Sequence, residues 1–224
     1  MNKVYFILVE LVSIFALLSI PFEIHQQKKA SELIKYTLVI DPGHGGKDNG
    51  CCSNDVYEDE INLEIAKALS SELISQGFMV YLTRDGDYDL ASDYALNRKN
   101  EDLKNRVKIV NSFEADILLS LHVNYYNNQS IYGPMVYYRY KDDSSKHLAE
   151  IIQNKLNEIN NLDKIIHSEN FYLFRNTTCL ALLIECGFIS NPSEKNKLTT
   201  PSYQNILAHQ ISQGVISYLS EINK

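Results

Sequence analysis

The sequence predicts one α/β domain with a mostly parallel sheet and helices on both faces, preceded by an N-terminal hydrophobic anchor helix. From Tyr36 onward, short apolar runs alternate with longer amphipathic segments, which is the order of elements in such domains. Several of the short runs are apolar almost throughout, as are strands buried on both faces of a parallel sheet. The 224 residues, 45 % hydrophobic and 22 % charged, suit a single globular domain.

The first 22 residues differ from the rest and predict a membrane anchor or a signal segment. Residues 4–22, VYFILVELVSIFALLSIPF, are almost entirely apolar, and roughly 20 such residues span a bilayer. The PFEI that ends this run lacks the small-residue exit of a cleaved signal, which favours an uncleaved anchor. A short start bearing Lys3 before a large domain is typical of export, so we expect an extracytoplasmic domain. Residues 23–35 then link the membrane segment to the domain at 36–224.

The first half of the domain predicts three strands and two helices. Ile61, Ile65 and Leu69 recur at helical spacing, and Gly77 is a stop signal for that helix. Asp102 is a plausible N-cap for the second helix. The predicted elements are a strand at 36–41, a helix at 60–77, a strand at 78–84, a polar excursion at 85–101, a helix at 102–113 and a strand at 116–122.

The second half continues the same alternation. A Gly-Pro turn precedes one apolar run, and CLALLIE is apolar up to its last residue, as befits a buried strand. A long amphipathic segment closes the chain. The predicted elements are a strand at 133–140, a helix at 144–160, a strand at 179–185 and a helix at 202–221.

Charge and cysteine content narrow the classes of partner and site. The net charge of −7, without a basic cluster, argues against nucleic acid as the main partner. Cys51 and Cys52 are adjacent and lack the two-residue gap of a zinc-binding cysteine pair. The sequence leaves open a disulfide between that pair and Cys179 or Cys186, in a compartment that permits it.

Four polar residues stand at or near predicted strand ends. His44 follows the first strand in a glycine-rich loop, Glu58 opens the first helix, and His122 and Glu185 each end an apolar run. In open α/β sheets, ligands bind at the carboxyl ends of strands. Two imidazoles and a carboxylate are a common zinc set, and a further carboxylate can then accept a proton from water. We also expect Asp41 to accept a hydrogen bond from a ligand histidine.

Each of these residues also has a structural interpretation. A histidine at a strand end is more often a hydrogen-bonded structural residue than a metal ligand. Glu58, like the acids Asp59 and Glu60 beside it, could simply favour the positive end of the helix dipole. Glu185 is the hardest to explain structurally, because a carboxylate at the edge of an apolar core persists only when it is paired or coordinated.

Six motifs together resemble the zinc-dependent N-acetylmuramoyl-L-alanine amidases. They are VIDPGHGGKDNG, EDEINLEIA, TRDGD, LKNRVKIVN, ADILLSLHVN and LALLIECGFISNPSE, in this order between residues 36 and 222. The resemblance implies zinc held by His44, Glu58 and His122, with Glu185 as the catalytic carboxylate, in a domain with a mixed six-stranded sheet. Three acids stand together where the family usually has one acid followed by a lysine, so Glu60 is a rival to Glu58.

The resemblance also implies a reaction, which is hydrolysis of the amide between the lactyl group of N-acetylmuramic acid and L-alanine in peptidoglycan. A short catalytic domain behind an anchor is similar to the amidases of the spore cortex, which act toward muramic-δ-lactam and matter for sporulation and germination. Three alternatives stay open: a vegetative autolysin, a zinc carboxypeptidase-like wall hydrolase, and a non-catalytic wall-binding protein. A regulatory partner cannot be read from the sequence.

Several further residues are candidates for contact with the substrate. Arg106 and Arg175 would recognise carboxylates of the stem peptide, and Asn124 follows the second histidine closely. An ordinary surface position is the alternative for both arginines. The family usually has a small residue where Tyr125 and Tyr126 stand, so we expect these tyrosines to reshape the substrate cleft.

Overall fold

The computed structural model describes residues 35–223. The predicted anchor or signal at 1–22 and nearly all of the predicted linker at 23–35 lie outside the described residues, so this division stays a prediction. Within the described part of the chain, no helix combines the length and the apolar character needed to cross a membrane.

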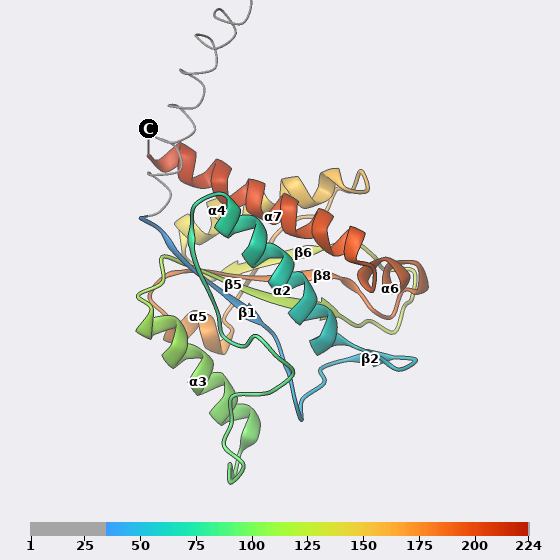
Figure 1. Cartoon of the computed structure of the whole chain (residues 1–224). Helices are drawn as coiled ribbons and strands as arrows, with labels where there is room; N and C mark the ends of the chain where they lie inside the picture. Colours follow the sequence, from blue (N-terminus) through green and yellow to red (C-terminus); the bar gives the residue numbers. More distant parts are fainter. Residues whose placement is uncertain (1–34, 224) are drawn as a thin grey trace, which may run out of the picture.

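A mixed six-stranded sheet forms the centre of the domain (Figure 1), which confirms the α/β prediction. The strand order is β4-β1-β5-β8-β6-β7; the first four strands are parallel, β6 runs antiparallel to β8, and β7 runs parallel to β6. The strands are β1 (Thr37–Pro42), β4 (Met79–Leu82), β5 (Ile117–Asn124), β6 (Met135–Arg139), β7 (His167–Glu169) and β8 (Leu180–Phe188). A separate hairpin joins β2 (Cys52–Ser53) to β3 (Val56–Tyr57).

Helices cover both faces of this sheet, as Figure 1 shows. Helix α7 packs against both α2 and α4 on one face, whereas α3 contacts α5 on the other. The short helix α6 packs against β8 and α7. The helices are α2 (Glu58–Ser75), α3 (Arg98–Ser112), α4 (Asp143–Glu158), α5 (Tyr172–Asn176), α6 (Pro192–Leu198) and α7 (Pro201–Ile222).

Two apolar cores hold the sheet between these layers. Along β1, Leu38 and Ile40 enter the core beneath α2 and α7, while Val39 enters the smaller core beneath α3 and α5. Because successive side chains of a strand point to opposite faces, an uninterrupted apolar run is what two-sided burial requires. Full burial of each such side chain contributes about 1.5–3 kcal/mol.

The start of α3 corrects one sequence prediction. The helix begins at Arg98, and its N-cap is Asn97, whose side chain accepts a hydrogen bond from the Asn100 backbone N–H. Asp102 therefore lies inside the helix, where its carboxylate accepts from the Leu90 N–H at 2.8 Å. The polar excursion is correspondingly shorter than predicted.

The elements that the sequence analysis missed are all short, and they comprise the β2–β3 hairpin, β7, α5 and α6. None is long enough to show a helical or alternating pattern. Strand β8 also continues to Phe188, so Glu185 lies within the strand and pairs with His122 in register. None of the four cysteines forms a disulfide in the structure.

Candidate active site

The glycine-rich loop after β1 brings His44 against the other candidate residues. A Cβ atom on Gly43 would lie 2.2 Å from the His122 ring, and one on Gly50 would lie 2.4 Å from the Glu58 carboxylate. Gly50 also has a φ of 67°, a conformation that favours glycine. These glycines therefore allow the backbone to approach both polar side chains closely.

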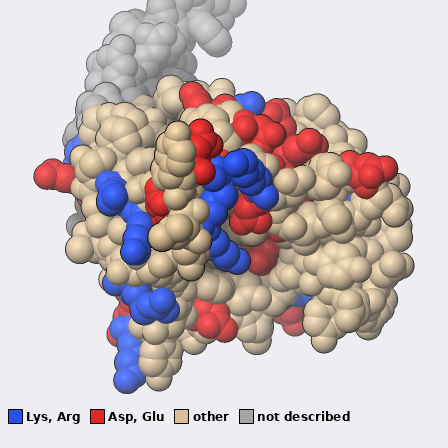
Figure 2. Space-filling model, turned by 90° about the horizontal axis from the view of Figure 1, so that it is seen from below, with Lys and Arg blue, Asp and Glu red and all other residues tan. Residues whose placement is uncertain are grey.

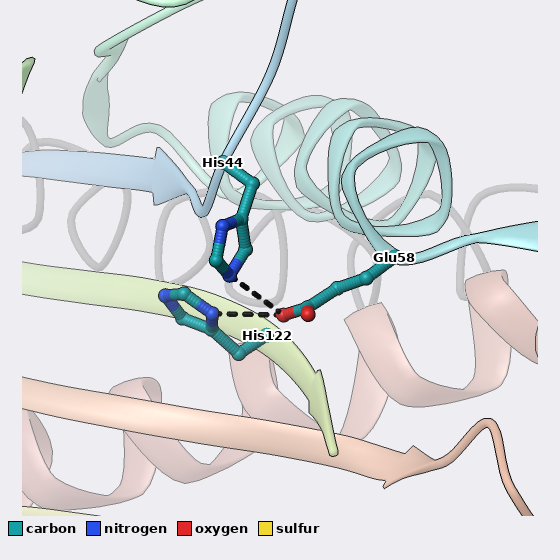
Figure 3. A group of neighbouring side chains, drawn as sticks. All are labelled: His44, Glu58 and His122. Atoms are coloured by element: carbon teal, nitrogen blue, oxygen red, sulfur yellow. Dashed lines mark hydrogen bonds and ion pairs between the residues drawn. The ribbon is translucent and has the colours of Figure 1, made fainter. Parts of the chain in front are cut away.

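His44, Glu58 and His122 converge at the carboxyl edge of the sheet (Figure 3). One carboxylate oxygen of Glu58, Oε1, lies 3.3 Å from His44 Nε2 and 2.9 Å from His122 Nδ1. The two imidazole rings meet edge to face, with centroids 5.0 Å apart. One nitrogen or oxygen from each of the three residues falls within 4.8 Å of the others.

Glu58 is held in place by three different elements. It is the first residue of α2, and its carboxylate accepts hydrogen bonds from the backbone N–H groups of Cys51 (2.8 Å) and Val123 (3.2 Å). The Asn62 side chain, one turn further along α2, donates at 3.3 Å. Glu58 is 5 % exposed, whereas Glu60 lies on the exposed side of the same turn, so the fold brings Glu58 and not Glu60 to the histidines.

Asp48, not Asp41, orients the loop histidine. The Asp48 carboxylate lies 2.9 Å from His44 Nδ1, which leaves Nε2 facing Glu58. Asp41 instead accepts hydrogen bonds beneath the loop from Thr83, Ser120 and Arg106. The prediction for Asp41 was wrong because Thr83, Ser120 and Arg106 occupy both of its carboxylate oxygens.

Burial and charge shift the pKa values of the converging groups. Burial lowers the pKa of His44, but the neighbouring Glu58 and Asp48 carboxylates outweigh it and raise the pKa to about 9. Burial raises the pKa of Glu58, but the two histidines outweigh it and hold that pKa well below its usual range. These opposite shifts show a site in which negative and positive charge stabilise each other.

Glu185 lies beside this group without a partner of its own. Burial raises the pKa of Glu185 to about 7, against a smaller lowering effect of His122. Its Oε2 atom is buried and has no hydrogen-bond partner among the described residues. A buried polar atom without a partner is costly, so its position points to an unmet ligand or reaction role.

The converging residues fit a zinc ion. Zinc bonds of about 2.0–2.2 Å place tetrahedral ligand atoms about 3.3–3.6 Å apart, close to the separations between Glu58 and the two histidines. Two imidazoles and one carboxylate leave a fourth position free, and the orphaned Glu185 oxygen lies at the same sheet edge. His44, Glu58 and His122 could therefore hold the metal, with Glu185 outside the ligand set.

A cavity of about 290 Å³ opens beside the site. Its polar lining includes His44, His122, Glu185 and Arg106. Its apolar lining includes Phe171 and Tyr172 at the start of α5. Lys99, near the start of α3, adds an exposed ammonium group to the lining. The cavity therefore combines the candidate catalytic residues with an apolar wall and a cation, which suits a partly charged substrate.

Arg106 lies in the cavity wall, and its guanidinium group is held there by acceptors of the protein itself. Its side chain is 2 % exposed, and it donates to Asp41 and Asp102 at 2.7 Å each and to the backbone carbonyls of Pro42 and His44. All three guanidinium nitrogens thus have protein acceptors. Arg106 also lines the cavity beside His44, His122 and Glu185, so its recognition of a substrate carboxylate stays a prediction.

Arg84 is a second buried arginine, which the sequence analysis did not single out. It is 1 % exposed and donates to the carbonyls of Pro42, Gly43 and Asp59. The two arginines together fasten the loop that carries His44 to the end of β4 and to α3. The signal in the sequence was the TRDGD motif, whose role only the fold reveals.

The other predicted contact residues lie at the margin of the site. Arg175 is exposed on α5, where its guanidinium lies 6.0 Å from the centre of the Tyr172 ring. Asn124 ends β5, and its side chain accepts from the Tyr125 N–H. Neither lines the cavity. Their roles stay predictions.

Comparison with known proteins agrees with this geometry. The family model described as N-acetylmuramoyl-L-alanine amidase matches residues 38–217. The germination-specific N-acetylmuramoyl-L-alanine amidase of Bacillus subtilis is 37 % identical over 189 residues, which cover 82 % of this chain and 80 % of that protein.

Two solved structures share the fold. The CwlD amidase of Clostridioides difficile, determined in complex with the GerS lipoprotein, superimposes with a TM-score of 0.80 at 33 % identity, covering 83 % of this chain and 99 % of that one. An N-acetylmuramoyl-L-alanine amidase from Clostridium difficile 630 gives a TM-score of 0.74 at 37 % identity, covering 84 % and 98 %.

Proposed function

The chain belongs to the N-acetylmuramoyl-L-alanine amidase family and is a hydrolase of peptidoglycan, and we propose that it works with zinc held by His44, Glu58 and His122. The observation that carries the proposal is the shared Glu58 oxygen, which lies within about one ligand–ligand distance of both imidazoles. When bound, zinc supplies Lewis acidity that activates water and polarises the amide carbonyl.

Glu185 is the proton carrier in this proposal. The bond that breaks joins the lactyl carbonyl carbon of N-acetylmuramic acid to the nitrogen of L-alanine, and a water oxygen forms the new bond to that carbon. Glu185 accepts a proton from the attacking water and returns it to the departing alanine nitrogen. Burial, which raises the pKa of the Glu185 carboxyl, suits a group that first accepts a proton and then returns it.

The cavity is suited to the peptide side of the substrate. The stem peptide carries carboxylates, and the exposed Lys99 ammonium in the lining is placed to attract one of them. Arg106 in the cavity wall, and Arg175 and Asn124 at the margin, stay candidates for further contacts with the stem. Phe171 and Tyr172 would pack against the aliphatic parts of the peptide.

The biological setting is proposed from the relatives. The similar Bacillus subtilis protein is named for germination, and the similar CwlD amidase was solved with a lipoprotein bound. We therefore favour action on the spore cortex, outside the cytoplasm and at a membrane surface, with a protein partner that regulates the enzyme. A vegetative autolysin with the same chemistry is the alternative.

The decisive experiment digests purified peptidoglycan with the full chain and identifies the products. New amino termini on L-alanine, with the stem peptides intact, indicate the amidase. Release of single amino acids would instead indicate a carboxypeptidase-like hydrolase, and the absence of any product would indicate a wall-binding protein.

One variant of Glu185 and a matched pair of variants at Glu58 and Glu60 test the residue roles. We expect Glu185→Gln to retain zinc and to lose hydrolysis by about 10²–10⁴-fold, the usual contribution of a positioned acid–base group. We expect Glu58→Gln to lose zinc, whereas Glu60→Gln keeps both zinc and activity because Glu60 is exposed. Metal content by atomic emission and product release by chromatography are the two measurements. Full activity in Glu185→Gln would remove that residue from the mechanism.

A further inference from the structure

The loop between β5 and β6 carries three exposed tyrosines. Tyr125, Tyr126 and Tyr132 are 47 %, 55 % and 50 % exposed. The residues between them are mostly amides and hydroxyls, in the order NNQSI. Aromatic side chains held in solvent bury little area within the protein, and three of them on one loop offer a ligand both apolar ring faces and hydroxyl groups.

This loop is fastened to the chain that follows β8. The Tyr126 N–H donates to the buried Ser190 hydroxyl at 3.0 Å, and the Gly133 N–H donates to Glu194 at 2.9 Å. Between these two points, the Asn191 side chain donates to a loop carbonyl at 2.8 Å. The tyrosines thus stand on a backbone that is anchored at both ends and in the middle, which reduces the entropy lost on binding.

The loop lies at the same sheet edge as the candidate active site. It begins directly after β5, the strand that carries His122, and it ends at β6, where Met135 pairs with Glu185. A substrate that reacts at Glu185 would therefore have this loop next to it. The cavity wall formed by α3 and α5, which includes Lys99, would lie on the other side of the substrate.

A second cavity, of about 260 Å³, adjoins the loop and is lined mainly by hydrogen-bonding groups. Its lining combines one phenol ring with amide, hydroxyl and charged groups from the neighbouring segments. The Lys197 and Glu194 side chains are its only ionised groups, and both Glu194 oxygens are taken by backbone N–H groups. The lining residues are Tyr132, Asn160, Asn191, Ser193, Glu194 and Lys197.

The surface on this side is mostly uncharged. Figure 2 shows the face seen from below, toward which β1 runs in Figure 1, with basic side chains gathered at the left and in the middle. The right-hand part, on the side where Figure 1 places α6 and the β2–β3 hairpin, carries few charged side chains. A neutral ligand fits this part better than the acidic stem peptide does.

We propose that Tyr125, Tyr126 and Tyr132 form a sugar-binding surface, here called the tyrosine ledge, for the glycan strand of the substrate. Tyr125 and Tyr126 stack on the apolar faces of sugar rings, and Tyr132 borders the cavity that takes a hydroxyl or N-acetyl substituent. Lys164 lies 5.8 Å from the centre of the Tyr132 ring and helps to hold that ring. The proposal rests on the proposed function, because it assumes that the glycan is bound while its peptide is removed.

The test compares two substrates and one competitor. The substrates are intact peptidoglycan and a muramyl tripeptide that has no neighbouring sugars, and the competitor is glycan from which all stem peptides have been removed. For the double variant Tyr125→Ala/Tyr126→Ala we expect KM on peptidoglycan to rise about tenfold. We expect hydrolysis of the muramyl tripeptide to be unchanged. The peptide-free glycan should inhibit the wild-type enzyme and have little effect on the variant.

The matched control is Tyr94→Ala/Tyr140→Ala, which removes two exposed tyrosines from other loops and should change none of these values. Thermal unfolding shows whether each variant folds, and the single variant Tyr126→Ala replaces the double one if that fails. Equal KM values for wild type and variant overturn the proposal. Equal inhibition of the wild type and the variant by the peptide-free glycan also overturns the proposal. This holds even if the variant has lost binding to a protein partner.

Failure of the proposed function gives a different result. In that case the wild-type chain cleaves neither substrate. Co-sedimentation of the chain with peptide-free glycan then still tests the tyrosine ledge directly. Loss of co-sedimentation in Tyr125→Ala/Tyr126→Ala, but not in the control, would support the ledge without any catalysis.

Discussion

Gly43 lies so close to the His122 imidazole that no larger residue fits between the loop and β5. A Cβ atom at position 43 would lie 2.2 Å from Cε1 and 2.4 Å from Nε2 of that ring, far below the separation of real side-chain contacts. The Gly43 N–H also donates to the Leu121 carbonyl at 2.9 Å, so the backbone cannot easily move away. At the scale of single residues, the absence of a side chain sets the position of a candidate ligand.

We therefore expect Gly43→Ala to displace the His122 ring and to weaken zinc binding by about 10–100-fold, the usual effect of disturbing the support of a ligand. Competition with a chelator of known affinity measures this directly. Gly86→Ala is the control, since its nearest neighbour is the partly exposed ring of Tyr88 at 3.1 Å, which can turn aside. Unchanged zinc affinity in Gly43→Ala would show that His122 is not a ligand.

At the scale of elements, buried arginines join the loop after β1 to the surrounding structure. Arg106 extends from α3 to Asp41 in β1 and to the carbonyls of Pro42 and His44. Arg84, after β4, donates to Pro42 as well, so both guanidinium groups hold the same loop. Charge inside the domain thus serves to fix the backbone that presents His44.

Removing the Arg106 guanidinium should destabilise the fold strongly. Arg106→Met removes the cation that pairs with the buried carboxylates of Asp41 and Asp102. Breaking a buried ion pair of this kind costs about 3–5 kcal/mol. Urea unfolding monitored by circular dichroism measures the change in the free energy of unfolding. Arg98→Met, which breaks the more exposed pair with Asp89, should have a much smaller effect. Equal losses in the two variants would contradict the structural role of Arg106.

At the scale of the whole molecule, rising pH should destabilise the metal-free fold and increase the stabilisation that zinc provides. Without metal, His44 has a folded-state pKa of about 9 against its usual 6.5. Its contribution to stability is therefore fully present below pH 6.5 and is lost as the pH rises through about 9. Zinc requires neutral imidazoles, so the stabilisation by zinc grows over the same range.

We expect the chelator-treated protein to unfold at a lower temperature at pH 9 than at pH 6, and the gain from added zinc to be larger at pH 9. Thermal unfolding of the full chain, with and without one equivalent of zinc, provides both values. His44→Gln should flatten the pH dependence of the metal-free protein between pH 6.5 and 9, because it removes the titrating imidazole. A gain from zinc that shrinks with rising pH would argue against histidine ligands.

The long elements could be predicted from the sequence because their patterns are local. β1, β5 and β8 are apolar runs, which indicates burial on both faces of the strand. α2, α4 and α7 repeat apolar residues at helical spacing, which indicates burial on one face of the helix. The order of these elements was enough to place His44, His122 and Glu185 at one edge of the sheet. The cap of α3 was misjudged, since Asn97 and Asp102 are both plausible caps in isolation.

Tertiary structure decided which neighbouring acid meets which partner, where the sequence had left Glu60 as a rival to Glu58. Glu58 and Glu60 lie two residues apart, and only the packing of α2 against β5 turns Glu58 toward the imidazoles. In the same way Asp48, not Asp41, reaches His44, and Arg106 is buried beneath the loop. The physical reason is that hydrophobic periodicity fixes which face of an element is buried, whereas hydrogen-bond partners depend on contacts between residues far apart in the sequence, which the register of the assembled sheet determines.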